Sequence, residues 1–90
     1  KEIHKYLKKI DGWHVLKDKD NNYYIEKNFK FENYTESEKF ILGVGKIAET
    51  EGHHPDISFG WGYAKIKIST HAIKGLAESD FVLAAKIDKI

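Results

Sequence analysis

Apolar residues in this chain recur with two different spacings, and the order of those spacings constrains the fold more than any other feature. A two-residue alternation, typical of strands with one buried face, covers residues 13–17, 23–31 and 61–70. Apolar residues three and four apart, typical of amphipathic helices, cover residues 3–10, 36–51 and 78–89. A further short strand before the last helix is an open alternative. This order predicts an α+β domain whose helices cover one face of an antiparallel sheet.

Turn and cap residues mark where these elements begin and end. Residues 18–22 are all polar turn formers, so a hairpin is expected to join the first two strands. Thr35 and Glu38 have the spacing of a capping box, which predicts the start of the second helix. Gly52 is expected to lie near the end of that helix, and residues 53–60 to form a loop.

Composition bounds the class of protein. Ninety residues, 41% of them apolar, predict a single globular domain over the whole chain. The absence of cysteine excludes disulfide frameworks, thiolate metal sites and cysteine nucleophiles. The longest apolar run, residues 81–85, is too short for a membrane span, so we expect a protein of the cytoplasm. All fifteen basic residues are lysine, which argues against direct nucleic-acid recognition because that chemistry relies on arginine.

Three of the five histidines concentrate in one stretch of the sequence. His53 and His54 follow a predicted helix end, and His71 follows a predicted strand end. Ends of regular elements are where a rigid scaffold presents functional side chains. Imidazole also exchanges protons near neutral pH without special tuning, so acid–base chemistry is the favoured interpretation. The other two, His4 and His14, are expected to be ordinary surface residues.

A zinc site is the alternative use of three imidazoles, with Asp56 as a fourth ligand. Adjacent histidines on an extended loop point in opposite directions, which makes joint chelation awkward. The spacing matches no standard metal signature. The sequence therefore favours a site without a metal ion.

The spacing of these residues resembles the signature of the pterin-4a-carbinolamine dehydratases. That signature reads Glu49, three residues, His53-His54-Pro55, five residues, Trp61, nine residues, His71, eight residues, Asp80. Gly12-Trp13, Ala48-Glu49, Ser69-Thr70-His71 and Gly75-Leu76 also look like family positions. The resemblance covers about residues 12–88. It implies the family's fold, a four-stranded antiparallel sheet with three helices packed on one face.

Family membership would imply a specific reaction. It is the removal of water from a 4a-hydroxytetrahydropterin to give the quinonoid dihydropterin, with no metal or organic cofactor. The resemblance makes His53 and His71 the candidates for proton transfer and His54 a positioning imidazole. The chain departs from many members at Gly52, Ile73 and Ala77, where others carry an acidic residue, a cysteine and a helix-capping hydroxyl.

The resemblance also implies a set of substrate-binding residues. They are Glu49, Trp13, Pro55, Ser69, Thr70 and Asp80. Trp13 would stack on the pterin, and Glu49 would contact its amino edge or be only a charged residue near a helix end. Asp80 would orient His71, or serve only as a carboxylate favoured by the helix dipole. Trp61 is expected in the core or in a subunit contact.

A second function class stays open, because some animal relatives bind and stabilise a homeodomain transcription factor, which would also place the protein in the nucleus. The helix over residues 36–51 is unusually apolar, and Leu42 faces away from its buried stripe. Gly43 and Gly45 would let another helix approach closely. We therefore predict a homodimer or homotetramer that uses this helix, with no membrane contact and no direct contact to nucleic acid.

Overall fold

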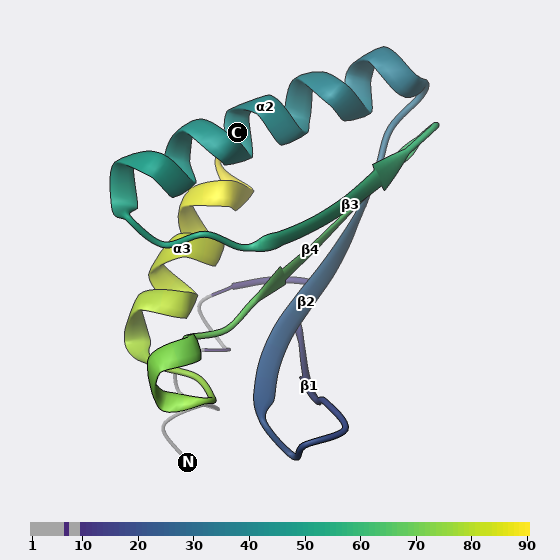
Figure 1. Ribbon diagram of the computed structural model, residues 1–90. Helices are drawn as coiled ribbons and strands as arrows, with labels where there is room; N and C mark the ends of the chain where they lie inside the picture. The colour runs from purple at the N-terminus through teal and green to yellow at the C-terminus, as the bar shows by residue number, and fades with distance from the viewer. Residues whose placement is uncertain (1–6, 8–9) are drawn as a thin grey trace.

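The computed structural model describes Leu7 and residues 10–90 of the chain. Its elements, labelled as in Figure 1, are β1 (His14–Lys17), β2 (Tyr23–Lys30), α2 (Tyr34–Glu51), β3 (Asp56–Gly60), β4 (Tyr63–Ile68), the single-turn 3₁₀ helix η1 (His71–Ile73) and α3 (Glu78–Asp88). Apart from Leu7 and Ile10, the first predicted helix lies outside the described residues. The described part of the chain thus holds two of the three expected α-helices.

The strands form one antiparallel sheet in the order β1-β2-β4-β3, with α2 and α3 on one of its faces (Figure 1). The predicted four-stranded antiparallel sheet is confirmed, but its fourth strand is not where the sequence indicated. β3 occupies the predicted loop, ahead of β4 in the chain. Its half-buried Ile57 and Phe59 alternate with exposed Asp56 and Ser58, an alternation too short to mark a strand by itself.

The core lies between the sheet and the two helices. Ala64, Ile66 and Ile68 of β4 are completely buried, as their alternation predicts. α3 supplies the opposing surface through its predicted apolar positions, which are Phe81, Leu83, Ala84 and Ile87. This packing fixes the axis of α3 against the sheet and thereby the place of its first turn, which belongs to the candidate site.

α2 begins earlier than its sequence pattern indicates. The side chain of Asn33 accepts a hydrogen bond of 2.9 Å from the backbone N–H of Glu36, so Asn33 is the N-cap. The prediction of a cap at Thr35 is wrong, because asparagine is the better N-cap and Asn33 precedes Thr35 in the chain. The predicted end is confirmed: Gly52 adopts a left-handed backbone with φ 66° directly after Glu51.

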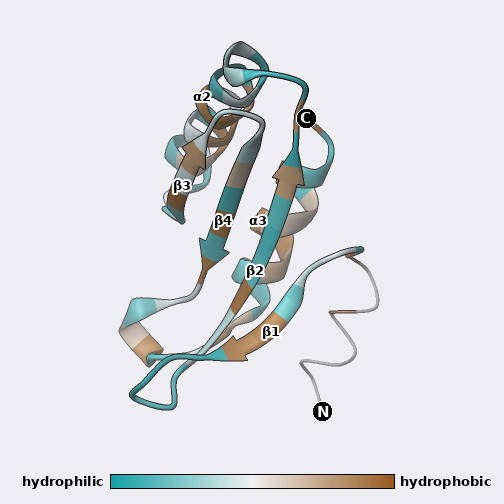
Figure 2. Cartoon of the chain, turned by 90° about the vertical axis from the view of Figure 1, so that its right-hand side faces the viewer, coloured by the Kyte–Doolittle hydropathy of each residue, from teal (hydrophilic) through white to brown (hydrophobic). Residues whose placement is uncertain are grey.

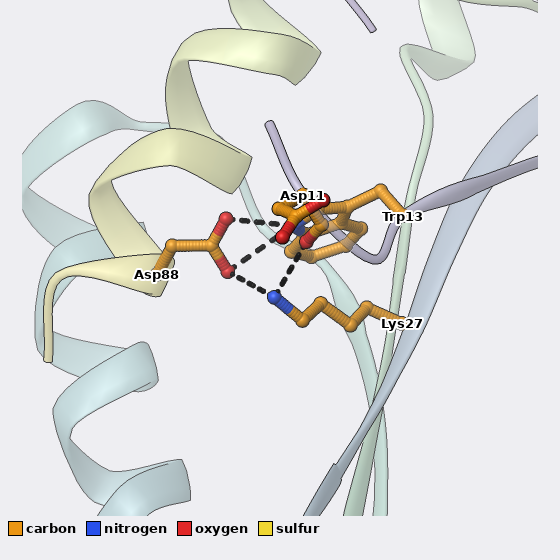
Figure 3. A network of polar contacts seen from close by, with 4 residues as sticks. All are labelled: Asp11, Trp13, Lys27 and Asp88. Carbon is orange, nitrogen blue, oxygen red and sulfur yellow. Dashed lines mark hydrogen bonds and ion pairs between the residues drawn. The ribbon is translucent and has the colours of Figure 1, made fainter. Parts of the chain in front are cut away.

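A polar network ties the hairpin to the C-terminal end of α3 (Figure 3). The indole N–H of Trp13 points at both carboxylate oxygens of Asp88, at 3.0 and 3.2 Å. Lys27 donates to Asp88 at 2.9 Å and to the backbone carbonyl of Asp11 at 2.7 Å. Trp13 itself is 4% exposed and packs edge-on against Phe29. The network therefore fastens β1 and β2 to the helix that carries Asp80 at its other end.

Candidate active site

All three candidate histidines lie at one end of the sheet. Asp56, the first residue of β3, pairs with Lys67 near the end of β4. Residues 53–55, which lead into β3, therefore lie beside residues 69–71, which leave β4. The β1–β2 turn is at the same end, towards which the arrow of β4 points in Figure 2. The sheet register thus gathers segments far apart in the sequence around one small region.

Asp80 is the buried centre of this region. It is fully buried in the first turn of α3. Its Oδ1 lies 2.5 Å from Nε2 of His53, while Oδ2 accepts hydrogen bonds from the hydroxyl of Thr70 at 2.9 Å and the backbone N–H of Ala77 at 2.7 Å. The expectation that Asp80 orients His71 is wrong, because its carboxylate contacts His53.

Ala77 is the N-cap of α3 and has no side-chain acceptor, as the sequence indicates. The carboxylate of Asp80 reaches back to the Ala77 N–H and satisfies one donor that the missing cap leaves. Asp80 therefore also lies, as expected, at the N-terminal end of α3, where the helix dipole favours a carboxylate. One carboxylate serves both the helix terminus and the histidine.

The contact with Asp80 defines which nitrogen of His53 can exchange protons. A carboxylate in its ionised form only accepts hydrogen bonds, so with Asp80 ionised we infer that Nε2 of His53 carries the hydrogen that points at Oδ1. Nδ1 is then the nitrogen with a lone pair in the neutral ring. The side chain of His53 is 19% exposed, so the ring is held by the protein and still open to solvent.

His54 belongs to a second, exposed pair. Its Nε2 lies 2.5 Å from Oε2 of Glu49 in the last turns of α2, and both side chains are more than half exposed. An ion pair in this setting contributes little stability, because water screens it. The predicted residues His54 and Glu49 are thus brought together, and both remain accessible. Pro55 is half-buried between this pair and β3.

His71 opens η1 and is exposed beside a hollow of about 110 Å³. Ser69 and Thr70 share in lining the hollow, as do the β1–β2 turn and the first residues of β2. Lys67 and Tyr24 also line the hollow, and the ammonium of Lys67 lies 4.4 Å from the centre of the Tyr24 ring. Sequence reasoning missed Lys67 and Tyr24, because only the β2–β4 pairing brings the start of β2 beside the end of β4.

The turn that borders the hollow is held by Asp18. Its Oδ1 accepts hydrogen bonds from the backbone N–H groups of Asn22 at 2.9 Å and Asp20 at 2.8 Å. The bond from Asn22 has the largest effect and holds the pKa of Asp18 below its ordinary value of 3.8.

The two tryptophans lie away from the histidines. Trp13 is buried against Asp88, eight residues and about 12 Å along α3 from Asp80. Trp13 is therefore a core residue with little of its ring exposed, and its stacking on a pterin stays a prediction. Trp61 lies in the β3–β4 turn at the opposite end of the sheet and is 70% exposed, so the expected core position is wrong and a subunit contact stays a prediction.

The described residues also bear on two other features, a metal site and a membrane-spanning helix. Among them, no three histidine, cysteine or acidic side chains come close enough together to hold a metal ion. No helix in the same part of the chain is long and apolar enough to cross a membrane.

The fold and the site together define a class of protein: a small α+β domain that presents three histidines at one end of an antiparallel sheet, one of them bound to a buried carboxylate. The chain belongs to the pterin-4a-carbinolamine dehydratase family. The family model described as "Pterin 4 alpha carbinolamine dehydratase" matches residues 1–90. The predicted family resemblance is confirmed.

Individual relatives agree with this assignment. A protein of Rubrobacter xylanophilus is 43% identical over 89 residues, which cover 99% of this chain and 79% of that protein. A protein of Alkaliphilus metalliredigens is 45% identical over 89 residues, which cover 98% of this chain and 77% of that protein. Both are named, provisionally, as pterin-4-alpha-carbinolamine dehydratases.

Two solved structures share the fold. One is a "transcriptional coactivator/pterin dehydratase" from Brucella melitensis, with a TM-score of 0.88, 26% identity and coverage of 98% of this chain and 90% of that one. The other is a pterin dehydratase-like protein identified as a RuBisCO assembly factor of the alpha-carboxysome. It has a TM-score of 0.73, 24% identity and coverage of 87% of both chains. At that identity the second likeness shows the fold alone.

Proposed function

We propose that this protein is a 4a-hydroxytetrahydropterin dehydratase of the cytoplasm that serves tetrahydrobiopterin recycling. The observation that carries the proposal is the pairing of His53 with the buried carboxylate of Asp80 at the sheet end where His54 and His71 also lie. A protein that serves only as a binding partner does not need a partly buried, carboxylate-oriented imidazole open to solvent. Membership of the dehydratase family supports the same activity.

The reaction requires two proton transfers. The C4a–O bond breaks and the leaving hydroxide takes a proton to become water, while N5 loses its proton and forms a double bond to C4a. Hydroxide is a poor leaving group, so acid assistance is the larger need, and positioned acid–base groups contribute about 10²–10⁴-fold. We assign the proton transfers to Nδ1 of His53 and to the imidazole of His71, on opposite sides of the pterin.

The remaining contacts to substrate follow from what is accessible. His54 and Glu49 form an exposed pair beside His53, suited to hold the polar edge of a pterin. Pro55 and Ser69 border the same region and are proposed as further substrate contacts. No cofactor is assigned, because the reaction is a dehydration that needs only proton transfer.

A stopped-flow experiment tests the proposal. A 4a-hydroxytetrahydropterin generated in situ loses water spontaneously, and the purified protein should accelerate that loss in proportion to its concentration. A His53→Ala/His71→Ala double variant that folds normally is the matched control and should leave the background rate unchanged. Equal rates with wild type, double variant and buffer would remove the enzyme assignment.

We also propose that two copies associate through α2. Leu42 is 61% exposed and, with Ile41 and Gly45, lines a wide apolar groove on the outer face of the helix. Glu38 and Lys46 lie four residues before and after Leu42, so an antiparallel second copy centred on Leu42 brings each Glu38 opposite a Lys46. This register makes the surface complementary to itself, and it allows a homodimer or a tetramer built from dimers.

The two glycines of α2 contribute differently to that surface. Beyond the helix's own backbone, a Cβ at Gly45 would meet no atom of the described residues within 4 Å, so the helix is open to a partner there. Gly43 instead faces Ile90, which lies 3.5 Å from the position of an added Cβ. Gly43 is therefore in contact with Ile90, so Gly45 is the glycine that we propose for the approach of a second helix.

The second candidate function is non-catalytic binding of a transcription factor. The exposed apolar face around Leu42 favours it, as does the likeness to the Brucella melitensis protein, which is described as a transcriptional coactivator as well as a pterin dehydratase. Glu49, the partner of His54, also lines the groove of Leu42, so the two surfaces adjoin. The stopped-flow comparison separates the two functions, because only a dehydratase accelerates the loss of water.

A further inference from the structure

Thr70 occupies a rigid position between β4 and η1. Its backbone N–H donates to the carbonyl of Gly75 at 2.8 Å, and its own carbonyl accepts from the N–H groups of Gly75 at 3.4 Å and Ile73 at 3.2 Å. These bonds close the segment that follows β4 into a small loop. These backbone bonds fix where the Cα–Cβ bond of Thr70 points, and the hydrogen bond to Asp80 then sets the direction of the hydroxyl.

The hydroxyl of Thr70 is hydrogen-bonded to Asp80. It donates a hydrogen bond of 2.9 Å to Oδ2, the oxygen that also accepts from the Ala77 N–H. Two donors from different segments thus hold one oxygen of the carboxylate. The other oxygen, Oδ1, is left to face His53.

We propose that Thr70 is a positioning residue for His53 rather than a contact for the substrate. Its hydroxyl fixes the rotation of the Asp80 carboxylate, which in turn holds His53 with its hydrogen on Nε2 and presents Nδ1 for proton exchange. The inference rests on the proposed dehydratase function for its kinetic consequence. Its structural part, the protonation pattern of one imidazole, is independent of any activity.

The backbone N–H of Ala77 cannot do this alone. With Ala77 as the only donor to Oδ2, the carboxylate can rock about its Cβ–Cγ bond, which moves the oxygen that faces His53 out of line with Nε2. The hydroxyl supplies a second direction that limits this movement. Since Asp80 is fully buried, water does not take the place of a missing donor without entering the core.

Two variants separate a positioning role from a substrate contact. Thr70→Val keeps the branched shape and removes the hydroxyl, while Thr70→Ser keeps the hydroxyl. For Thr70→Val we expect kcat to fall about 10-fold, the loss for one hydrogen bond to a charged group, with KM unchanged and an altered pH profile of kcat. Thr70→Ser should stay near wild type. Thr35→Val, at an exposed position of α2, is the matched control and should change nothing.

Nitrogen NMR of the histidine rings gives the readout that needs no activity. In wild type at a pH where His53 is neutral, we expect its hydrogen on Nε2, and in Thr70→Val a mixture of the two tautomers. A wild-type His53 with its hydrogen on Nδ1 overturns the proposal, as does a raised KM with unchanged kcat in Thr70→Val. If Thr70→Val does not fold, the wild-type spectrum decides. An inactive wild type that shows the Nε2 hydrogen refutes only the proposed function.

Discussion

Replacing Asp80 by asparagine tests the site most sharply, because the change is nearly isosteric and reverses one hydrogen bond. The amide oxygen can take the place of Oδ2 and accept from Thr70 and Ala77. The amide NH₂ then takes the place of Oδ1 and donates to His53, which forces Nε2 to accept and moves the ring hydrogen to Nδ1. The variant should therefore hold the wrong tautomer in an otherwise intact fold.

The magnitudes follow from these contacts. Asp80→Asn makes three charge-assisted hydrogen bonds neutral, and part of that loss is offset because a neutral amide costs less to bury than a carboxylate, so we expect a loss of about 1–2 kcal/mol of unfolding free energy. Asp80→Ala leaves three donors without a partner and should cost about 3–5 kcal/mol, much of the total for a domain of this size. Dehydration by Asp80→Asn should be about 10²-fold slower, the contribution of one positioned acid–base group.

Urea unfolding followed by circular dichroism measures the first quantity, and stopped-flow dehydration the second. Glu78→Gln makes the same chemical change at an exposed position in the same helical turn, and it should alter neither. A folded Asp80→Asn protein with the wild-type rate would contradict the proposed role of Asp80. So would an Asp80→Ala protein as stable as wild type.

Three further outcomes can be measured. Dehydratase activity should survive exhaustive chelation with EDTA, because the proposed mechanism uses no metal ion; activity lost with EDTA and restored by zinc would contradict this. Leu42→Lys should shift sedimentation towards the monomer and keep the helical circular dichroism signal. Lys46→Glu should also weaken the dimer, and adding Glu38→Lys to that variant should restore association. Unchanged sedimentation in every variant would exclude α2 as the interface. Asp18→Ala should lower the urea midpoint near neutral pH. Because folding lowers the pKa of Asp18, its stabilisation is present above pH 3.8 and is lost as the pH falls through the lowered value, so the two proteins should converge in acid; a difference independent of pH would contradict the assignment.

The elements with long, regular patterns could be predicted from the sequence. Ile66 and Ile68 are buried where their alternation requires, and Phe81 and Ile87 are buried on the inner face of α3. The strand over Asp56–Gly60 was missed because only two half-buried side chains carry its pattern. Pairing with β4 stabilises this strand, and pairing partners do not appear in a local pattern.

The sequence spacing indicates which residues belong to the candidate site, but it only partly indicates which of them contact one another. The spacing identified His53 and Asp80, but the partner of Asp80 depends on how the first turn of α3 faces the segment before β3. Trp13 matches the family position, yet the network with Asp88 buries it. Such contacts join residues far apart in the sequence, and only the packed structure decides between them.

We propose that three histidines at one end of the sheet dehydrate a pterin carbinolamine. The most direct measurement is the stopped-flow dehydration rate of the single variants His53→Ala, His54→Ala and His71→Ala beside wild type, with circular dichroism to confirm folding. Each variant should be at least about 10-fold slower than wild type. Wild-type rates in all three folded variants would contradict the acid–base assignment and favour the binding-partner function.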